Sequence, residues 1–274
     1  MVPVPDEPLL RLESLSVAFR HDRRRVQATS DLSLTVVPGR ILGVVGESGS
    51  GKSVTIRAML GLLPAGAQVT SGVMSWHGRR LDLADTRSVR RLCGVELGFI
   101  PQDPFGALNP RLSVRNQFRS VLRLTGVSRR DADPIAAEAL RSVGIMHAEA
   151  VLRRYPFELS GGMAQRVVIA LTLMRGPEVL LADEPTTGLD STVQKQVLDL
   201  IASLVGTGRT KAAVLVTHDL GVVANYCADV IVVYRGEAVE AGPVDEVLRH
   251  ANHPYTRELV GALTAASQLE PGTG

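Results

Sequence analysis

The sequence predicts an α/β fold with a parallel central sheet, and three observations lead to this prediction. Apolar segments of strand length recur at 41–45, 96–100, 178–183, 213–217 and 229–234. Helical patterns lie between them, and strands that alternate with helices favour parallel pairing. A glycine-rich segment, GESGSGKS at 46–53, separates the first of these strands from a helical stretch, as the phosphate loops of such folds do.

Composition limits the classes of protein that the chain can belong to. Its 274 residues suit one large domain or one domain with a small appendage, and 45% hydrophobic residues can build a core. The formal net charge of +2 gives no reason to expect a nucleic-acid partner. Cys93 and Cys227 lie far apart and form neither a disulfide framework nor a CxxC pair, which fits a reducing compartment.

No segment has the character of a membrane span or a leader. Residues 1–15 lack a basic region followed by an apolar run, so we expect no signal peptide. A spanning helix needs about 20 apolar residues, whereas the longest apolar runs, 41–46 and 230–234, have the length of buried strands. We therefore expect any work at a membrane to pass through partner subunits.

The N-terminal part predicts antiparallel strands. Apolar and polar residues alternate at 9–19 and 31–37, as in strands with one buried face, and the charged residues 21–25 between them predict a turn. The continuously apolar strand 41–45 follows and is expected to be covered on both faces.

The middle of the chain predicts a helical subdomain. Residues 103–160 lack a clear strand, and the segments 113–125, 131–143 and 145–155 have helical patterns. We expect this stretch to be inserted in the α/β core. The tail from 249 onward is also expected to be helical, ending before EPGTG at 270–274.

The phosphate loop is the strongest chemical motif in the sequence. Its residues are Gly46, Glu47, Ser48, Gly49, Ser50, Gly51, Lys52 and Ser53. Glycines let backbone N–H groups converge on phosphates, and the helix that follows offers its positive N-terminal end. Lys52 can reach the β- and γ-phosphates of a nucleotide, and Ser53 can bind Mg²⁺. A plain flexible turn is the alternative, which the strand before the loop and the helix after it disfavour.

Two carboxylates end a buried strand. The segment VLLADE at 179–184 places Asp183 and Glu184 at the carboxyl edge of the predicted sheet, where ligands bind in open α/β folds. Asp183 is expected to hold Mg²⁺ through water, and Glu184 to polarise the attacking water. Alone, the pair could be a polar strand end, but downstream of a phosphate loop it predicts nucleotide hydrolysis.

A further motif, LSGGMAQR at 159–166, resembles the signature of ATP-binding cassette (ABC) ATPases, usually LSGGQ, with Met163 in place of the glutamine. Ser160, Gly161 and Gly162 open a helix, and their N–H and hydroxyl groups suit a γ-phosphate. In the family, that phosphate is bound to the opposite subunit of a head-to-tail dimer. An ordinary helix N-cap with a glycine turn is the alternative for this motif taken alone.

Other landmarks of the family fall at matching positions. Gln102 resembles the Q-loop glutamine, which contacts Mg²⁺ and senses the transmembrane partner, and Asp190 in TTGLD resembles the D-loop aspartate at the dimer interface. His218 resembles the switch histidine that contacts the γ-phosphate. Val54, directly after the loop, is also expected to contact the nucleotide. Phe19 is placed where an aromatic ring stacks on adenine, with a packed residue of its own strand as the alternative.

The resemblance covers most of the chain and implies its architecture. It implies an ABC-type P-loop ATPase core with an antiparallel β-subdomain and a helical signature subdomain. The ABC ATPase domain would span 9–249, with its helical subdomain at about 103–160, followed by a short C-terminal extension at 250–274 that carries an HPYT motif.

Several segments resemble the peptide and nickel importer branch of the family. They are HPYTREL at 253–259, PQDPFGALNP at 101–110, YPFELSGGMAQR at 155–166 and LGLLPAGAQVTSG at 60–72, the last being similar to nickel-type members. The branch implies ATP hydrolysis that energises uptake of dipeptides, oligopeptides or nickel, at the cytoplasmic face of the cell (inner) membrane. It implies transmembrane permease subunits, an external substrate-binding protein, and a second ABC ATPase subunit, a paralogue or an identical copy.

Three alternatives remain beside this interpretation. The substrate could be a metallophore or another chelate; the chain could be a non-transport ABC ATPase; or it could bind nucleotide without hydrolysing it. Intact Lys52, Glu184 and His218 disfavour the last. Because both cysteines lie outside the C-terminal extension, we expect no iron–sulfur cluster there, and His250 and His253 lack the further ligands of a metal site.

Overall fold

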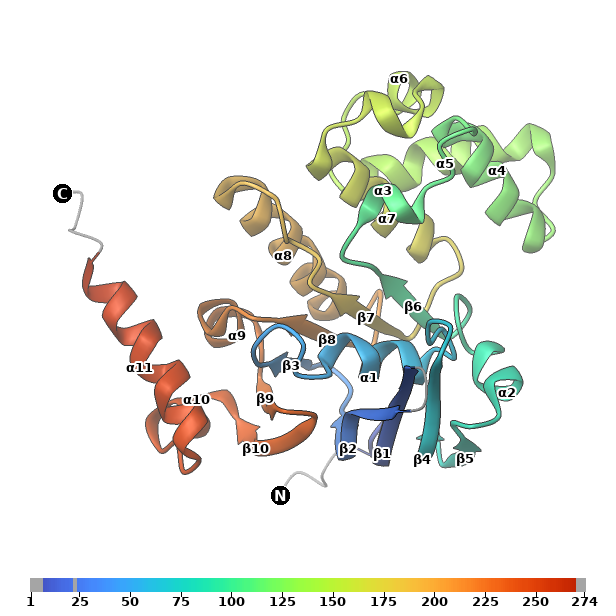
Figure 1. Cartoon of the computed structure of the whole chain (residues 1–274). Coiled ribbons are helices and arrows are strands. Elements are labelled where there is room, and N and C mark those ends of the chain that lie inside the picture. The colour runs from blue at the N-terminus through green and yellow to red at the C-terminus, as the bar shows by residue number, and fades with distance from the viewer. Residues whose placement is uncertain (1–6, 22–23, 270–274) are drawn as a thin grey trace, which may run out of the picture. The chain divides into compact units, whose positions relative to one another are not determined.

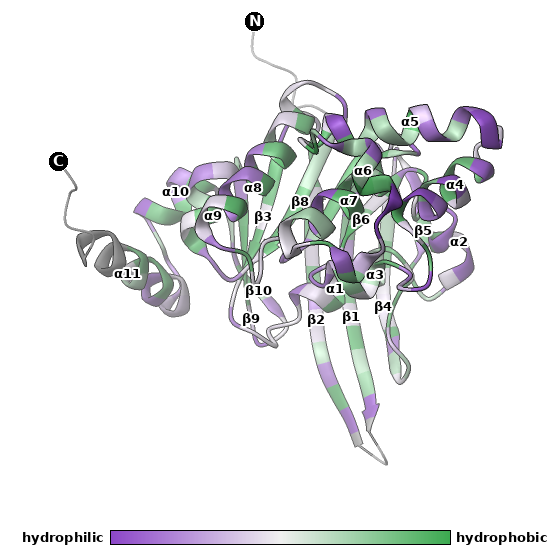
Figure 2. Ribbon diagram, turned by 90° about the horizontal axis from the view of Figure 1, so that it is seen from above, coloured by the Kyte–Doolittle hydropathy of each residue, from purple (hydrophilic) through white to green (hydrophobic). Residues whose placement is uncertain are grey.

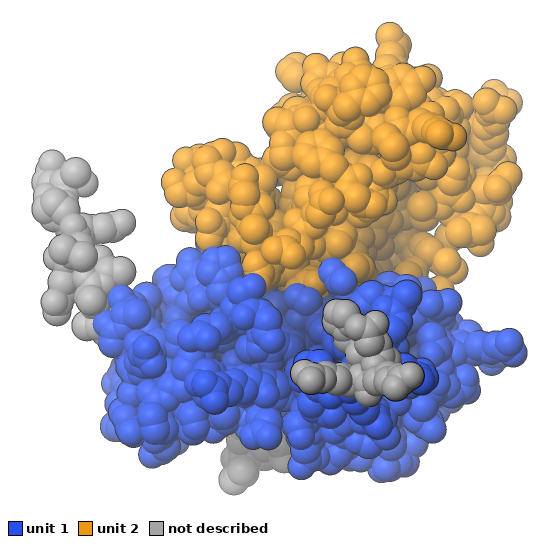
Figure 3. Space-filling view, in the orientation of Figure 1, with its two compact units in different colours: residues 1–93, 211–274 blue, residues 94–210 orange. Residues whose placement is uncertain are grey.

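A computed structural model gives the structure of the chain and describes residues 7–21 and 24–269 (Figure 1). The chain divides into two compact units, which Figure 3 shows in different colours. Unit 1 comprises residues 1–93 and 211–274, and unit 2 comprises residues 94–210.

Unit 1 contains an antiparallel sheet in the order β2-β1-β4-β5. Its strands are β1 (Leu10–His21), β2 (Arg24–Val36), β4 (Ala67–Trp76) and β5 (Arg79–Asp82). Leu12 of β1 stands opposite Leu34 of β2 on one side and Met74 of β4 on the other. All three side chains are buried, so the alternating pattern of this region does mark a sheet with one face in the core.

The expected charged turn at 21–25 is wrong in its extent. His21 belongs to β1, and β2 begins at Arg24, seven residues before the expected strand at 31–37. Backbone pairing continues through Arg20 and Arg25, both charged, and the neighbouring Val26 is 56% exposed, so burial of an apolar face does not mark this part of the strands. The bounds of β4 and β5 were not predicted, because most positions of β4 are partly or fully exposed and its apolar residues do not alternate regularly.

A second sheet of unit 1 carries the phosphate loop. Its strands are β3 (Ile41–Val45), β8 (Ala212–Thr217), β9 (Asp229–Tyr234) and β10 (Glu237–Pro243). β3 pairs in parallel with both β8 and β9, whereas β10 pairs antiparallel with β9. All residues of β3 and β8 are buried, and Figure 2 shows both strands as hydrophobic. The predicted parallel core is confirmed here; β10, partly exposed along its length, was not expected.

The described residues of unit 1 form five helices. They are α1 (Lys52–Met59), α2 (Thr86–Arg90), α9 (Leu220–Tyr226), α10 (Val244–Arg249) and α11 (Pro254–Leu269). The tail is helical from 254, as expected, but α10 ends at Arg249 and the chain starts a new helix at Pro254, where proline suits the first helical turn. The expected end of the tail at 270–274 lies outside the described residues.

Unit 2 combines two parallel strands with helices. Its elements are β6 (Leu97–Ile100), α3 (Pro104–Ala107), α4 (Val114–Leu124), α5 (Arg129–Ser142), α6 (Ala148–Arg153), the 3₁₀ turn η1 (Pro156–Glu158), α7 (Gly161–Leu173), β7 (Val179–Asp183) and α8 (Ser191–Gly206). Residues 103–160 are all described and contain helices and no strand, as the sequence predicts. α6 is shorter than the expected helix at 145–155, because the backbone is already extended at Arg154.

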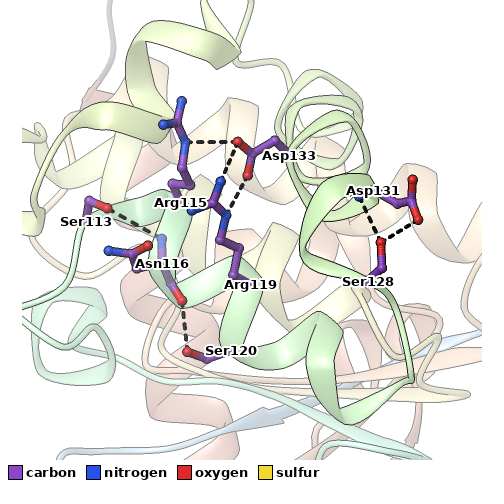
Figure 4. Close-up of polar contacts among 8 residues, drawn as sticks. All are labelled: Ser113, Arg115, Asn116, Arg119, Ser120, Ser128, Asp131 and Asp133. Carbon is purple, nitrogen blue, oxygen red and sulfur yellow. Dashed lines mark hydrogen bonds and ion pairs between the residues drawn. The ribbon is translucent and has the colours of Figure 1, made fainter.

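Helices α4 and α5 are joined by a charged cluster (Figure 4). Arg119 donates two hydrogen bonds to the carboxylate of Asp133, each 2.8 Å long, and Arg115 Nε lies 3.3 Å from the same carboxylate. Ser113 and Ser128 cap the N-termini of the two helices with their side-chain oxygens. Phe118 of α4 is fully buried, so the helices combine an apolar inner face with a charged outer edge.

None of the helices in the described part of the chain combines the length and the apolar character that a membrane crossing requires. Cys93 and Cys227 are both free thiols, as their separation in the sequence predicts.

Candidate active site

The phosphate loop begins where a buried strand ends. All residues of β3 are buried, the loop runs from Gly46 to Gly51, and α1 starts at Lys52. In the parallel register Val45 stands beside Thr217, the last residue of β8. Gly46 and His218 therefore leave two neighbouring strands at the same edge of the sheet, so the predicted loop and the predicted switch histidine share one edge within unit 1.

Lys52 organises the loop from inside. Its ammonium group donates hydrogen bonds of 2.7 Å to the carbonyl oxygens of both Gly46 and Glu47 and lies 3.5 Å from Ser50 Oγ. Lys52 is only 3% exposed. A buried ammonium group is costly unless it is hydrogen-bonded, and here loop carbonyls provide that compensation. Phosphate oxygens can take over the same role when a nucleotide binds.

Two glycines of the loop are required by close approach of other segments. A Cβ atom at Gly46 would collide with the carbonyl oxygen of Val233 in β9. Gly51 has φ +105°, and a Cβ atom there would lie 2.6 Å from the carbonyl oxygen of Ala28 in β2. These contacts hold both ends of the loop, while Glu47, Ser48 and Gly49 at its tip are exposed to solvent and can meet a ligand.

The start of α1 supplies further groups. Ser53 and Val54 are half-buried in its first turn, and Thr55 is anchored because its hydroxyl donates to the carbonyl oxygen of Gly51 at 3.0 Å. α1 has no acidic residue in its first turn, so the positive end of its dipole is not offset locally. This arrangement favours an anionic ligand at the loop.

Unit 2 brings together two predicted residues that are 82 positions apart. In the parallel register of β6 and β7, Ile100 stands beside Ala182, so two residues further on Gln102 falls level with Glu184. Gln102 Nε2 donates to Glu184 Oε2 at 3.2 Å. Thr187 Oγ1 donates to the same oxygen at 2.9 Å. The carboxylate of Glu184 is thus oriented by two neutral donors.

The backbone of Glu184 adopts an uncommon conformation. Its φ is +45°, in the left-handed region that non-glycine residues rarely occupy. The sharp turn directs the chain away from β7 straight after Asp183, whose side chain is fully buried at 0% exposure. Strained backbone of this kind clusters at functional sites, which agrees with the predicted importance of this strand end.

The signature segment forms a helix N-terminus. Ser160 caps α7, and its Oγ accepts a hydrogen bond from the N–H of Met163 at 3.3 Å. Gly162 has no room for a side chain, because a Cβ atom would collide with Cγ1 of Val193 in α8. Asp190 caps α8 by accepting from the N–H of Val193 at 3.0 Å. The structure therefore shows Ser160 and Asp190 as helix caps, which was the alternative interpretation of the Ser160 motif, and the roles of both residues towards a second subunit stay predictions.

A cavity of about 330 Å³ lies within unit 2 beside Gln102. It is lined by Gln102, Asp103, Pro104, Phe105, Gly161, Gln165, Pro185, Thr187, Gly188 and Leu189. The segments after β6, at the start of α7 and after Glu184 therefore line one shared cavity.

Phe19, His253 and His250 have simple local surroundings. Phe19 is half-buried in β1 between Val26 and Ala67 of the neighbouring strands, and its stacking on adenine stays a prediction. His253 accepts a hydrogen bond at Nδ1 from the N–H of Tyr255 at 3.2 Å, which makes it the cap of α11. His250 lies at the end of α10.

Two residues near the site were not singled out from the sequence. Thr187 binds Glu184, and its position three residues later in the same turn is a signal that could have found it. Tyr255 accepts a hydrogen bond at its hydroxyl oxygen from the backbone N–H of Glu47 in the phosphate loop, at 2.8 Å. Its distance of 208 residues in the chain gives no local signal for this contact.

Comparison with known proteins decides the family. The family model described as ABC transporter matches residues 29–187, more than half of the chain. The chain belongs to the ABC transporter family. This ABC protein is also 42% identical to a peptide import ATP-binding protein of Brucella abortus (strain 2308) over 267 residues, which cover 94% of this chain and 78% of that protein. It is 41% identical to the glutathione import ATP-binding protein GsiA of Salmonella typhimurium over 262 residues, covering 93% of this chain and 42% of that protein.

Solved structures agree on the fold. A dimeric bacterial ABC transporter cassette matches with a TM-score of 0.72 at 25% identity, covering 86% of this chain and 98% of that chain. CbiO1 from Clostridium perfringens, part of the ABC transporter complex cbiONQ, matches with a TM-score of 0.72 at 24% identity, over 95% of this chain and 100% of that chain. The predicted ABC ATPase fold is confirmed, and with it the activity of this ABC protein: it binds nucleotide, and its ATP hydrolysis drives transport.

Proposed function

We propose that this ABC protein binds MgATP through its phosphate loop and hydrolyses it with residues that end strands β6, β7 and β8. Lys52 and the loop amides would hold the β- and γ-phosphates, supported by the polar, glycine-bounded loop and by the buried ammonium group. Phe19 and Val54 would contribute to nucleotide binding from β1 and α1.

The expected Mg²⁺ ligands are Ser53, Gln102 and Asp183. A hydroxyl, an amide oxygen and a buried carboxylate are hard oxygen donors, which fit Mg²⁺ and leave room for waters and phosphate oxygens. When bound, Mg²⁺ would neutralise charge on the phosphates. The chemistry of the donor set is thus suited to the ion that accompanies ATP.

In the proposed reaction, water attacks the γ-phosphorus and the bond to the oxygen of ADP breaks, giving ADP and phosphate. Glu184 would orient this water and accept its proton, a role supported by the orientation that Gln102 and Thr187 give its carboxylate. His218 would donate to the γ-phosphate as charge develops there. Lys52 would stabilise the same charge.

We infer that two ATPase subunits act together. Ser160, Gly161 and Gly162 of this chain would contact the γ-phosphate bound to the second subunit, and Asp190 would lie at their interface. The dimeric state of the similar bacterial cassette supports this arrangement. We expect the second subunit to be a paralogue, with an identical copy as the other outcome.

We propose peptide import as the transport that this hydrolysis energises. The observation that carries the proposal is 41–42% identity, over more than nine tenths of the chain, to proteins named for peptide and glutathione import. The chain would lie at the cytoplasmic face of the cell membrane against transmembrane permease subunits, with the segment 101–110 relaying closure to them. An external binding protein would deliver the substrate to the complex.

Uptake in a strain that lacks this chain tests the substrate class. Labelled dipeptide, labelled glutathione and labelled nickel are supplied in parallel, and the chain is returned either as wild type or as Lys52→Ala. Loss of dipeptide or glutathione uptake that only the wild-type chain restores supports the proposal. Selective loss of nickel uptake would assign the transporter to metal import. Unchanged uptake of all three would exclude peptide and nickel as its substrates.

A further inference from the structure

The C-terminal HPYT segment reaches the phosphate loop through one side chain. Tyr255, in the first turn of α11, accepts a 2.8 Å hydrogen bond at its hydroxyl oxygen from the N–H of Glu47. Both residues belong to unit 1. The motif therefore does more than mark a branch of the family, since it contacts the loop whose N–H groups would meet the nucleotide.

Tyr255 is held firmly enough to act as a fixed anchor. Its side chain is only 5% exposed, and its ring stacks on that of Tyr234 with centroids 4.3 Å apart and an interplanar angle of 28°. It belongs to an apolar cluster with Val45, Leu220, Val223, Val230, Val232, Val244 and Val247. Val45 is the last residue before the loop, so ring and loop are fastened to the same core.

The segment before Tyr255 is tied to the sheet as well. Glu240 of β10 accepts hydrogen bonds from the N–H groups of Asn252 at 2.8 Å and His253 at 3.2 Å. His253 in turn caps Tyr255 through Nδ1. The start of α11 is thus clamped to β10, and the position of the tyrosine hydroxyl does not depend on the distal part of the helix.

The anchor acts on the peptide group that Lys52 also holds. Lys52 Nζ bonds to the carbonyl oxygens of Gly46 and Glu47, each at 2.7 Å. When phosphates draw the ammonium group away, these two carbonyls lose their donor. The bond between Glu47 N–H and Tyr255 involves no atom of Lys52, so it can hold this part of the loop during the exchange. It also occupies the Glu47 N–H group, which is then not available for phosphate.

We propose that Tyr255 is a positioning residue for nucleotide binding: its hydroxyl fixes the first peptide of the phosphate loop in the shape that receives the phosphates. The proposal rests on the proposed role of the loop and of Lys52 in binding ATP. A buried tyrosine hydroxyl needs a partner, and here that partner is a loop amide.

Tyr255→Phe tests the proposal because it removes the acceptor and keeps the ring stack. Tyr234→Phe is the matched control, since it removes a hydroxyl from the other ring of the same stacked pair. ATP and ADP binding to the full chain is measured by titration calorimetry, together with the melting temperature of each variant. The KM and kcat for ATP hydrolysis are then measured in the assembled transporter.

We expect Tyr255→Phe to weaken ATP and ADP binding about 2- to 12-fold, the range that one lost hydrogen bond gives. KM should rise by a similar factor with kcat nearly unchanged, while Tyr234→Phe leaves affinity at the wild-type value. A purely structural role would lower the melting temperature and leave KM unmoved. Unchanged affinity in Tyr255→Phe, or an equal loss in both variants, overturns the proposal. If the wild-type chain itself fails to bind ATP, the proposed nucleotide site is wrong and the role of Tyr255 falls with it.

Discussion

The phosphate loop of unit 1 and the helical segment α4–α6 of unit 2 are stabilised in different ways. The loop is held by backbone groups and buried side chains: Lys52 is 3% exposed and donates hydrogen bonds to the carbonyl oxygens of Gly46 and Glu47, and Tyr255 holds Glu47 from the core. The helical segment instead has an apolar inner face, with its ion pairs at partly exposed positions such as Asp133, whose side chain is 32% exposed.

The two regions also differ in the apolar residues that they expose. Leu124, Met146 and Phe157, on or near the helical segment, are 68%, 78% and 72% exposed. Phe157 stacks on Tyr155, with centroids 5.6 Å apart. The backbone is therefore held most firmly where phosphates are expected to bind. The helical segment instead leaves apolar side chains on its surface, as a region that contacts a partner would.

The largest effect should come from Glu184, the carboxylate that directly follows β7. Glu184→Gln removes the carboxylate that would accept the water proton, so we expect ATP hydrolysis to fall about 10²- to 10⁴-fold while ATP binding is kept. Steady-state phosphate release and equilibrium ATP binding measure the two quantities. Glu246→Gln, at an exposed position of α10, serves as the control and should hydrolyse ATP normally. Hydrolysis by Glu184→Gln at the wild-type rate would contradict the assignment.

The next effect should come from the core of the helical segment. Phe118→Ala opens a cavity at a fully buried site, and we expect it to lower the free energy of unfolding by about 3–5 kcal/mol. Phe157→Ala removes the same side chain from a position that is 72% exposed and should change that free energy by no more than about 0.5 kcal/mol. Denaturant unfolding of the two variants checks this, and similar losses would show that burial does not distinguish the two positions.

A smaller effect should follow from breaking the charged cluster of α4 and α5. Asp133→Ala leaves Arg115 and Arg119 without their shared carboxylate, and because the groups are partly exposed we expect a loss of about 1–2 kcal/mol. The control is Asp199→Ala, which breaks an exposed i,i+4 pair with Lys195 and should cost at most about 0.5 kcal/mol. Thermal melts at low and high salt measure the stability that each variant loses. An equal loss in the two variants would refute the prediction.

The smallest effect should be a pH dependence that arises in unit 1. Burial raises the pKa of the Cys227 thiol from its ordinary value of 9.0 to about 12. The folded state therefore keeps this proton where the unfolded state releases it, so stability is complete below pH 9 and declines as pH rises towards 12. At pH 10 the loss should be about 1 kcal/mol.

Comparing the wild type with Cys227→Ala isolates the contribution of the Cys227 thiol to the pH dependence of stability. The variant is less stable at every pH because the smaller side chain leaves a cavity. Its stability should nevertheless fall less between pH 8 and pH 10 than that of the wild type. Urea unfolding at the two pH values measures the difference. Parallel declines in both proteins would mean that the thiol of Cys227 does not contribute.

Some elements of the fold could be predicted because their signal is local. The strands β3, β7, β8 and β9 are continuous apolar runs within six residues, and all have the expected bounds to within one residue. β10 and the first half of β2 were missed because their residues are largely exposed, so pairing with a neighbour, and not apolar periodicity, makes them strands. α6 fell short of its expected length because the backbone straightens at Arg154.

By itself, the sequence determined the family, the phosphate loop and the residues expected to act on ATP, because each is encoded in a short motif with its own backbone requirements. Only the tertiary structure decided which distant residues meet: Gln102 at Glu184, and Tyr255 at Glu47. The first meeting follows from the register of two parallel strands, and the second from the docking of α11 on the core beside Val45. Both depend on packing between segments far apart in the chain, which no local pattern of residues specifies.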